Sequence, residues 1–165
     1  MEIGVPNPDT VHYMSVPLFQ ERFLLAASKE VKIPCTEATP FPCTDTDVIR
    51  GKPVVILQEH MYLGRVFRQL LTDLNYIPLK ITECHNIETL HKLVAKNAGV
   101  SLLPEVSVSL RTLPDVNYYT LSDENMGRTV AAVYKKGSNK VDDILKFIDC
   151  LKEYLKTCHY PFNVS

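Results

Sequence analysis

Two short polar segments, each directly after an apolar run, carry the side chains in this sequence that are best suited to binding a small molecule. The first segment follows residues 54–57 and holds Gln58, Glu59, His60, Met61 and Tyr62, with Arg65 close behind them. The second follows residues 79–82 and holds Cys84, His85 and Asn86. In open α/β sheets, ligands bind beyond the carboxyl ends of the strands, where the free N–H groups of helix starts favour anions. We therefore predict that these residues bind a ligand, and that the ligand is a carboxylate or another anion.

The same residues also have structural interpretations. Asn86 can cap the helix that follows it by accepting a hydrogen bond from the N–H group of Thr89. Arg65 fits a solvent-exposed helix position better than an anion clamp, and His60 and Tyr62 fit a protein surface. A cap at the edge of a pocket can also contact a ligand, so both interpretations of Asn86 stay open.

Metal binding and catalysis find little support in the spacing of the candidate residues. The side chains of metal-ligand type are His60, Cys84, His85 and His91, and their spacing matches no zinc pattern. The sequence contains no G-x-S-x-G, P-loop, H-E-x-x-H or G-x-G-x-x-G motif. Asp142 and Asp143 are adjacent carboxylates, but they lie at a predicted helix start, where the helix dipole explains them. We therefore expect neither a cofactor nor an enzymatic activity.

The cysteine pattern predicts free thiols in a reducing compartment. There are five cysteines, Cys35, Cys43, Cys84, Cys150 and Cys158, and no pair forms C-x-x-C. Cys35 and Cys43 lie close together in a proline-rich segment, so a cysteine-based redox sensor is the alternative function. Lys32 lies near Cys35, but no basic residue adjoins Cys43 to activate its thiol.

An alternation of strand-like and helix-like segments positions the candidate residues. Helical periodicity covers residues 63–74, 87–94 and 141–155, and Gly99 suits the left-handed residue that closes the second helix. Apolar runs of strand length cover residues 23–27, 54–57, 79–82, 100–103 and 129–134. The order over residues 54–103 predicts a mainly parallel βαβαβ sheet. Residues 33–47 are expected to form a loop, and residues 114–123 an irregular connection.

Composition excludes several classes of protein. The chain has 165 residues, of which 45% are apolar and 22% charged, as in one globular domain or two small lobes. The net charge is −1 and no basic stripe or basic recognition helix stands out, which argues against nucleic-acid binding by this chain. No apolar run reaches the length of a membrane span, and the first residues do not resemble a signal peptide. We therefore expect a cytoplasmic protein.

Residues 89–105, which read TLHKLVAKNAGVSLLPE, resemble a known family pattern. They are similar to the helix, strand and proline of LysR-type effector-binding domains, with Asn97 where that family more often has glycine. Further similar segments are residues 17–27, 51–57, 128–134 and the helix that contains Phe147, Ile148 and Asp149. Because these segments follow one another as they do in the family, the resemblance covers nearly the whole chain.

The resemblance implies an α/β, periplasmic-binding-protein-like (type 2) effector domain that senses a small molecule for a DNA-binding transcription regulator. Residues 1–27 would be remnant strands of a first lobe, residues 28–112 the second regulatory lobe, and residues 113–165 the returning strand and C-terminal helix. The effector would be a small organic acid, an amino acid or an aromatic metabolite, bound between the lobes.

The resemblance also implies partners and leaves alternatives open. DNA would be contacted only through an N-terminal domain that this chain lacks, and the full-length regulator would be a homo-oligomer. Peroxide-sensing members of the family carry their cysteine pair after the strand that corresponds to residues 54–57, unlike Cys35 and Cys43. A solute-binding lobe unrelated to transcription is the remaining alternative.

Overall fold

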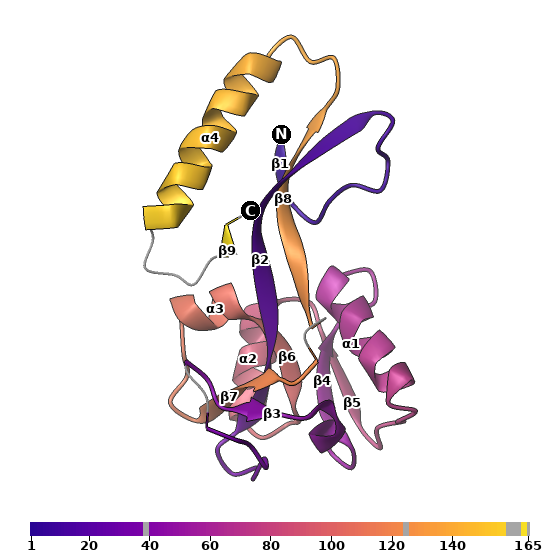
Figure 1. Ribbon diagram of the computed structural model, residues 1–165. Coiled ribbons are helices and arrows are strands. Elements are labelled where there is room, and N and C mark those ends of the chain that lie inside the picture. The colour runs from indigo at the N-terminus through magenta and orange to yellow at the C-terminus, as the bar shows by residue number, and fades with distance from the viewer. Residues whose placement is uncertain (38–39, 124–125, 158–162, 165) are drawn as a thin grey trace. The chain divides into compact units, whose positions relative to one another are not determined.

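Strand β2 (Tyr13–Ser28) takes part in both of the compact units into which the chain divides. In the computed structural model, which describes residues 1–37, 40–123, 126–157 and 163–164, unit 1 comprises Met1–Arg22 and Gly127–Ser165, and unit 2 comprises Phe23–Met126. Unit 1 therefore combines the two ends of the chain, whereas unit 2 is one continuous segment (Figure 1). The assignment of residues 1–27, 28–112 and 113–165 to the lobes of a family fold stays a prediction.

Unit 1 is an antiparallel sheet that packs against a long helix. β8 (Gly127–Lys135) lies between β1 (Glu2–Gly4) and the first part of β2, and β9 (Asn163–Val164) pairs with β2. Helix α4 (Val141–Thr157) packs on the sheet through a buried cluster of Leu18, Ala132, Tyr134, Ile148 and Leu155. Asp142 and Asp143 lie in the first turn of α4 and Lys156 in its last, the order of charges that the helix dipole favours.

A buried ion pair joins β2 to β8 at one end of this sheet. The Nε atom of Arg128 donates to the Oε2 atom of Glu21 over 2.6 Å. The Glu21 side chain is 4% exposed and the Arg128 side chain 27% exposed, so neither charge is fully hydrated. The two strands approach closely here, because a Cβ atom on Gly127 would lie 2.6 Å from the carbonyl oxygen of Glu21.

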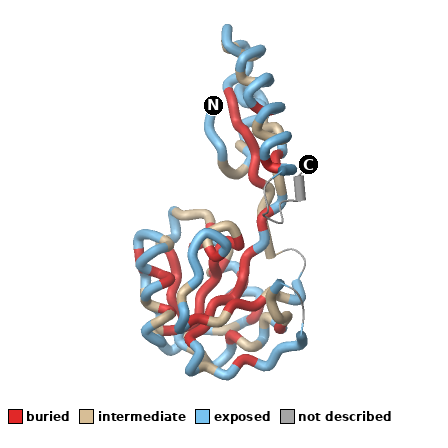
Figure 2. The backbone as a smooth tube through the Cα atoms, turned by 90° about the vertical axis from the view of Figure 1, so that its left-hand side faces the viewer, coloured by how far each residue is buried: buried red, intermediate tan, exposed pale blue. Residues whose placement is uncertain are grey.

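Unit 2 contains a sheet with both parallel and antiparallel neighbours. Its strands are β3 (Cys43–Thr44), β4 (Val54–Leu57), β5 (Ile81–Cys84), β6 (Ser101–Pro104), β7 (Val116–Leu121) and the last part of β2. β4 is parallel to β5 on one side and bridges Val100, just before β6, in parallel on the other. β6 and β7 are antiparallel to β2, and β3 is parallel to β7. β4 and β6 are buried along their whole length (Figure 2).

Two amphipathic helices cover the faces of this sheet. α1 (Tyr62–Asp73) buries the apolar residues Leu63, Phe67, Leu70 and Leu71. α2 (Ile87–Ala95) buries Leu90 and Val94. The crossovers from β4 to β5 and from β5 to β6 run in opposite directions, so right-handed connections place the two helices on opposite faces. The short helices η1 (Thr46–Ile49) and α3 (Glu105–Leu110) complete the unit. Within the described residues, every helix is too short or too polar to cross a bilayer.

The structure confirms the predicted helices and the βαβαβ order, and it corrects several details. The strand expected at residues 79–82 is wrong by two positions, because the ladder with β4 starts at Ile81 and ends at Cys84. The irregular connection expected at residues 114–123 is wrong, because Val116–Leu121 forms β7, which pairs with β2 on one side and with β3 on the other. The loop expected at residues 33–47 contains β3 and the start of η1. Asn97, with φ 58°, is the left-handed residue that follows α2, so the role given to Gly99 is wrong.

Candidate functional site

The two candidate segments leave the sheet at the same edge. Leu57 and Cys84, the last residues of β4 and β5, face each other in the parallel ladder. The N–H group of Gln58 then donates to the carbonyl oxygen of Cys84 over 3.2 Å, which ties the start of one loop to the end of the other strand. The structure therefore brings together the segments 58–62 and 85–86, as the parallel order of the strands predicts.

The loop between β4 and α1 is a tight turn held by Arg65. The Met61 N–H group donates to the Gln58 carbonyl oxygen over 3.0 Å, and the Nη1 atom of Arg65 donates to the His60 carbonyl oxygen over 2.8 Å. The Arg65 guanidinium also lies 5.9 Å from the centre of the Tyr62 ring. Gln58, Met61 and Tyr62 are half-buried, whereas Glu59, His60 and Arg65 are exposed. Arg65 thus lies at an exposed helix position, as expected, and it also holds the loop through the His60 carbonyl oxygen.

The start of α1 is close to the end of β4 and is suited to an anion. Met61 occupies the N-cap position, and its thioether lacks the oxygen that usually caps a helix. The first backbone N–H groups of a helix have no carbonyl partner within the helix, and they carry the positive end of its dipole. Tyr62 adds an aromatic ring at this point, with its centre 6.2 Å from that of Phe23.

Gly64 and Arg68 set this geometry, and sequence reasoning missed both. A Cβ atom on Gly64 would lie 2.2 Å from the carbonyl oxygen of Gln58 and 2.5 Å from that of Leu57, so only glycine fits. The Nη1 atom of Arg68 donates to the carbonyl oxygens of Leu57 (2.9 Å) and Gly64 (3.1 Å). Its Nη2 atom pairs with Glu83 on β5. No pattern in the sequence distinguishes Arg68 from other helix-surface arginines.

The second candidate segment is mainly structural in its contacts. The Oδ1 atom of Asn86 accepts from the Thr89 N–H group over 2.8 Å, which confirms the capping interpretation. His85 is exposed next to it. Cys84 lies inside β5, is 4% exposed, and its Sγ atom donates to the carbonyl oxygen of Ile56 over 3.5 Å. Burial raises the pKa of the Cys84 thiol, so the thiol stays protonated, and its hydrogen bond to the Ile56 carbonyl oxygen holds it within the sheet.

The structure does not gather the candidate metal ligands into a site, and the remaining cysteines lie outside the two loop segments. Among the described residues, no group of three or more His, Cys, Asp and Glu side chains could hold a metal ion. Thr36 and Cys43 exchange backbone hydrogen bonds of 2.8 and 2.9 Å, so they share one face of a short antiparallel pair. Cys35 precedes Thr36 and is exposed, Cys43 is half-buried, and both are free thiols. Cys158 lies outside the described residues.

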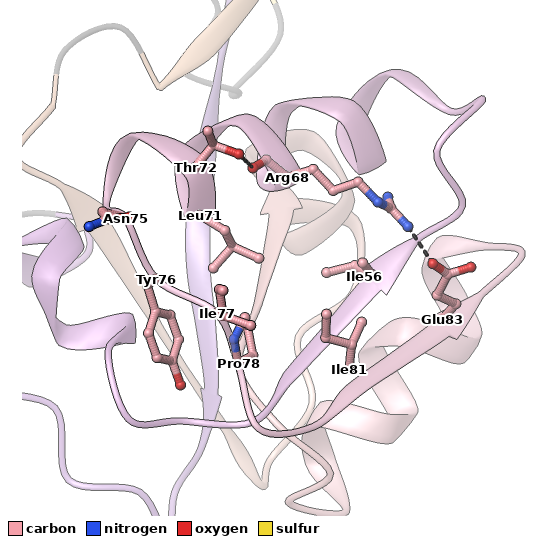
Figure 3. Close-up of a pocket in the computed structure, with 10 residues that line it drawn as sticks. All are labelled: Ile56, Arg68, Leu71, Thr72, Asn75, Tyr76, Ile77, Pro78, Ile81 and Glu83. Carbon is pink, nitrogen blue, oxygen red and sulfur yellow. Dashed lines mark hydrogen bonds and ion pairs between the residues drawn. The ribbon is translucent and has the colours of Figure 1, made fainter.

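A groove of about 450 Å³ lies between α1 and the edge strand β5, apart from the predicted residues (Figure 3). Its lining residues are Ile56, Arg68, Leu71, Thr72, Asn75, Tyr76, Ile77, Pro78, Ile81 and Glu83. Most of these side chains are apolar, and the Arg68–Glu83 ion pair closes one end (Figure 3). Ile77 and Ile81 are 89% and 48% exposed, and the adjacent Leu79 is 101% exposed.

An α/β sheet with polar loops and helix starts at one edge is the architecture of a ligand-binding lobe. The model of the LysR substrate binding domain matches residues 3–156, so the chain belongs to this family. The chain is thus an effector-binding domain of the kind found in LysR-type transcriptional regulators, and the expected periplasmic-binding-protein-like type 2 fold is confirmed.

Relatives and solved structures agree with this assignment. The chain is 29% identical over 136 residues to the "Hydrogen peroxide-inducible genes activator" of Haemophilus influenzae. The matched segment covers 79% of this chain and 42% of that protein. The Corynebacterium glutamicum OxyR C206 mutant superposes with a TM-score of 0.75 at 16% identity, over 93% of this chain and 47% of that one. The BenM effector binding domain with its effector benzoate superposes with a TM-score of 0.72 at 18% identity, over 96% of this chain and 72% of that one. The chain spans less than half of the length of the first two proteins.

Proposed function

We propose that this chain senses a small organic acid at the edge where β4 and β5 end, as the regulatory part of a LysR-type transcription regulator. The observation that supports this most directly is the start of α1, where Met61 leaves the N-cap position without an oxygen. Gln58 and His60 lie in the loop just before this point and Tyr62 is the first residue of α1, and the backbone N–H groups there suit a carboxylate. The ligand roles of Glu59, Arg65, His85 and Asn86 belong to the same proposal.

The starts of α1 and α2 differ in how many backbone N–H groups they leave free for an anion. Asn86 already satisfies the Thr89 N–H group, so the start of α2 has less to offer an anion. The start of α1 combines backbone donors with the Tyr62 ring, which favours an aromatic or other apolar acid. The similar BenM domain was solved with benzoate, a molecule of this chemistry. Cys84 contributes to the sheet and not to the ligand, because its thiol is buried.

A thermal-shift titration of this chain tests the proposal. We expect one acid from a panel of benzoate, other aromatic carboxylates, amino acids and aliphatic acids to raise the melting temperature saturably. At a hundredfold excess over the dissociation constant, binding to the folded state alone adds about 2.7 kcal/mol. Gln58→Ala should reduce the shift, and Gln69→Ala, which removes an exposed glutamine paired with Asp73 on the same helix, should not. A panel without any saturable shift, or shifts equal in both variants, would contradict the assignment.

The relative described as a peroxide-inducible activator favours a redox sensor as the second candidate. The pair proposed for it is Cys35 and Cys43, which lie eight positions apart in the sequence; Cys150, also exposed, lies on α4 in unit 1. Both members of the pair are free thiols in this structure, so this candidate requires that peroxide oxidise them to a disulfide within the proline-rich segment. Hydrogen peroxide is therefore included in the thermal-shift panel, and a shift with peroxide alone would favour this candidate.

We further propose that the chain acts without catalysis, resides in the cytoplasm, and reaches DNA through a separate domain of the whole regulator. Its charge of −1 offers no electrostatic attraction for phosphates. The groove between α1 and β5 supports self-association, because exposed apolar side chains beside an apolar groove can fill the groove of a second copy.

Leu79→Glu is expected to weaken this self-association by placing a charge among Ile77, Ile81 and the groove. Sedimentation velocity over a concentration series should show the wild-type chain moving toward a dimer while Leu79→Glu stays monomeric. Leu110→Glu is the matched control, since Leu110 is a 71% exposed leucine on α3. Equal association in all three proteins would rule out this surface.

A further inference from the structure

A histidine and a tyrosine form a buried hydrogen bond that joins α2 to β7. The Nε2 atom of His91 lies 2.5 Å from the hydroxyl oxygen of Tyr118, and the ring centres are 5.6 Å apart in an edge-on arrangement. His91 is 6% exposed and Tyr118 8% exposed. The candidate site uses neither residue, although α2 begins at that site with its cap Asn86.

The neighbouring contacts decide where the hydrogen atoms lie. The N–H group of Leu113 donates to the Tyr118 hydroxyl oxygen over 2.9 Å. In the described part of the chain, His91 and Leu113 are the hydrogen-bond partners of this hydroxyl, so its own hydrogen finds an acceptor only at Nε2. With the hydroxyl hydrogen assigned to Nε2, His91 is the neutral tautomer that carries its ring proton on Nδ1.

The surroundings oppose a positive charge on His91. Burial lowers the pKa of His91, and the positive charge of Arg111 lowers it further. The other charged groups beside it are Glu88 and Lys92 on α2, which pair with each other over 2.8 Å, and Glu88 also lies 3.7 Å from Arg111. β7 contributes the neutral Tyr118, and the segment before β3 contributes the Phe41 ring, 6.3 Å from the Tyr118 ring. A protonated His91 would be a second cation beside Arg111. None of these groups would neutralise it, because the Glu88 carboxylate already interacts with both Lys92 and Arg111.

We propose that His91 and Tyr118 form a protonation-sensitive latch that holds α2 against β7 in unit 2. A proton on Nε2 turns the acceptor into a donor, so the Tyr118 hydroxyl hydrogen loses its partner while a charge enters a buried position. Both effects disappear when α2 separates from β7 and His91 reaches water. Acid therefore favours the open form. The effect on ligand binding rests on the proposed function, since opening displaces Asn86, but the latch itself does not.

The sign and size of the pH dependence follow from linkage. The open form binds a proton near the ordinary histidine pKa of about 6.5, and the closed form binds it only at lower pH. The opening equilibrium is therefore independent of pH above about 6.5 and rises as pH falls below it, by at most about tenfold per pH unit.

Hydrogen exchange measures this opening directly. Protection factors of the α2 and β7 amides, corrected for the intrinsic rate at each pH, are compared between pH 7.5 and 5.5. The wild-type chain should lose protection at pH 5.5, whereas His91→Gln, which keeps an acceptor that does not titrate, should change much less. His12→Gln, which removes an exposed histidine of unit 1, should behave like the wild type in these amides.

Two results would overturn the latch. One is equal pH dependence of wild type and His91→Gln; the other is an NMR titration of the wild-type chain in which the His91 ring titrates at or above the ordinary histidine pKa of about 6.5. The titration needs no substitution, so it remains decisive even where His91→Gln lowers the stability of unit 2.

Discussion

Replacing Arg128 with alanine is expected to destabilise unit 1 by about 3–5 kcal/mol. Arg128 donates to the Glu21 carboxylate over 2.6 Å, and the Glu21 side chain is 4% exposed. Removal of the guanidinium leaves an uncompensated charge in a position that water barely reaches, and this desolvation dominates the loss. Urea unfolding followed by circular dichroism, with hydrogen exchange of the β2 and β8 amides to locate the effect, measures it.

Two comparison variants distinguish destabilisation by the uncompensated Glu21 charge from the effect of removing any arginine side chain. Arg111→Ala removes a partner of Glu88 where both side chains are about two-thirds exposed (65% and 64%), so it should cost at most about 1 kcal/mol. Glu21→Leu combined with Arg128→Leu removes both charges and should recover part of the stability lost in Arg128→Ala. An Arg128→Ala protein that unfolds within 1 kcal/mol of the wild type would mean that water hydrates Glu21 after all.

The second large effect is expected for Gly64→Ala, with a loss of about 3 kcal/mol or more in unit 2. The added methyl group would lie 2.2 Å and 2.5 Å from the carbonyl oxygens of Gln58 and Leu57. Both obstacles are backbone atoms, so α1 must move away from β4. That movement also lengthens the two hydrogen bonds from Arg68 to the carbonyl oxygens of Leu57 and Gly64.

Gly4→Ala is the control for Gly64→Ala, because a Cβ atom at Gly4 has its nearest neighbour at 3.8 Å, an ordinary contact. Melting curves should show a large drop for Gly64→Ala and a shift close to zero for Gly4→Ala. Ligand binding at the start of α1 should be weakened in Gly64→Ala at temperatures where the protein stays folded. Superimposable melting curves for Gly64→Ala and wild type would show that the approach of α1 to β4 is looser than described.

The local sequence pattern was sufficient to predict the helices and strands whose buried residues follow a regular spacing. α1 and α4 bury one stripe each, and β4 is buried on both faces, so periodicity and continuous apolarity identify them. The shared edge of the candidate loops also follows, because the order from β4 to β5 through a helix requires parallel strands. The roles of the site residues themselves stay predictions, apart from the cap formed by Asn86.

Other features depend on long-range contacts that no local pattern contains. β7 is a strand because β2 pairs with its residues 116–120, and its own sequence alternates too little to show this. Gly99 looked like a helix terminator, yet α2 ends earlier and Asn97 takes the left-handed conformation. Glycine is needed at position 99 for a different reason, since a Cβ atom there would lie 2.6 Å from the Pro53 carbonyl oxygen.

The division of unit 1 between the two ends of the chain imposes an order on folding during synthesis. Residues of β2 up to Arg22 leave the ribosome early, but their partner β8 follows only after the whole of unit 2. Glu21 and Arg128 are 107 positions apart, so their ion pair closes one of the longest loops in the chain. Unit 2 is continuous and can complete its core first. Until β8 arrives, the first part of β2 lacks its partner and exposes Leu18, a residue fully buried in the finished fold, so this segment can pair wrongly with other strands.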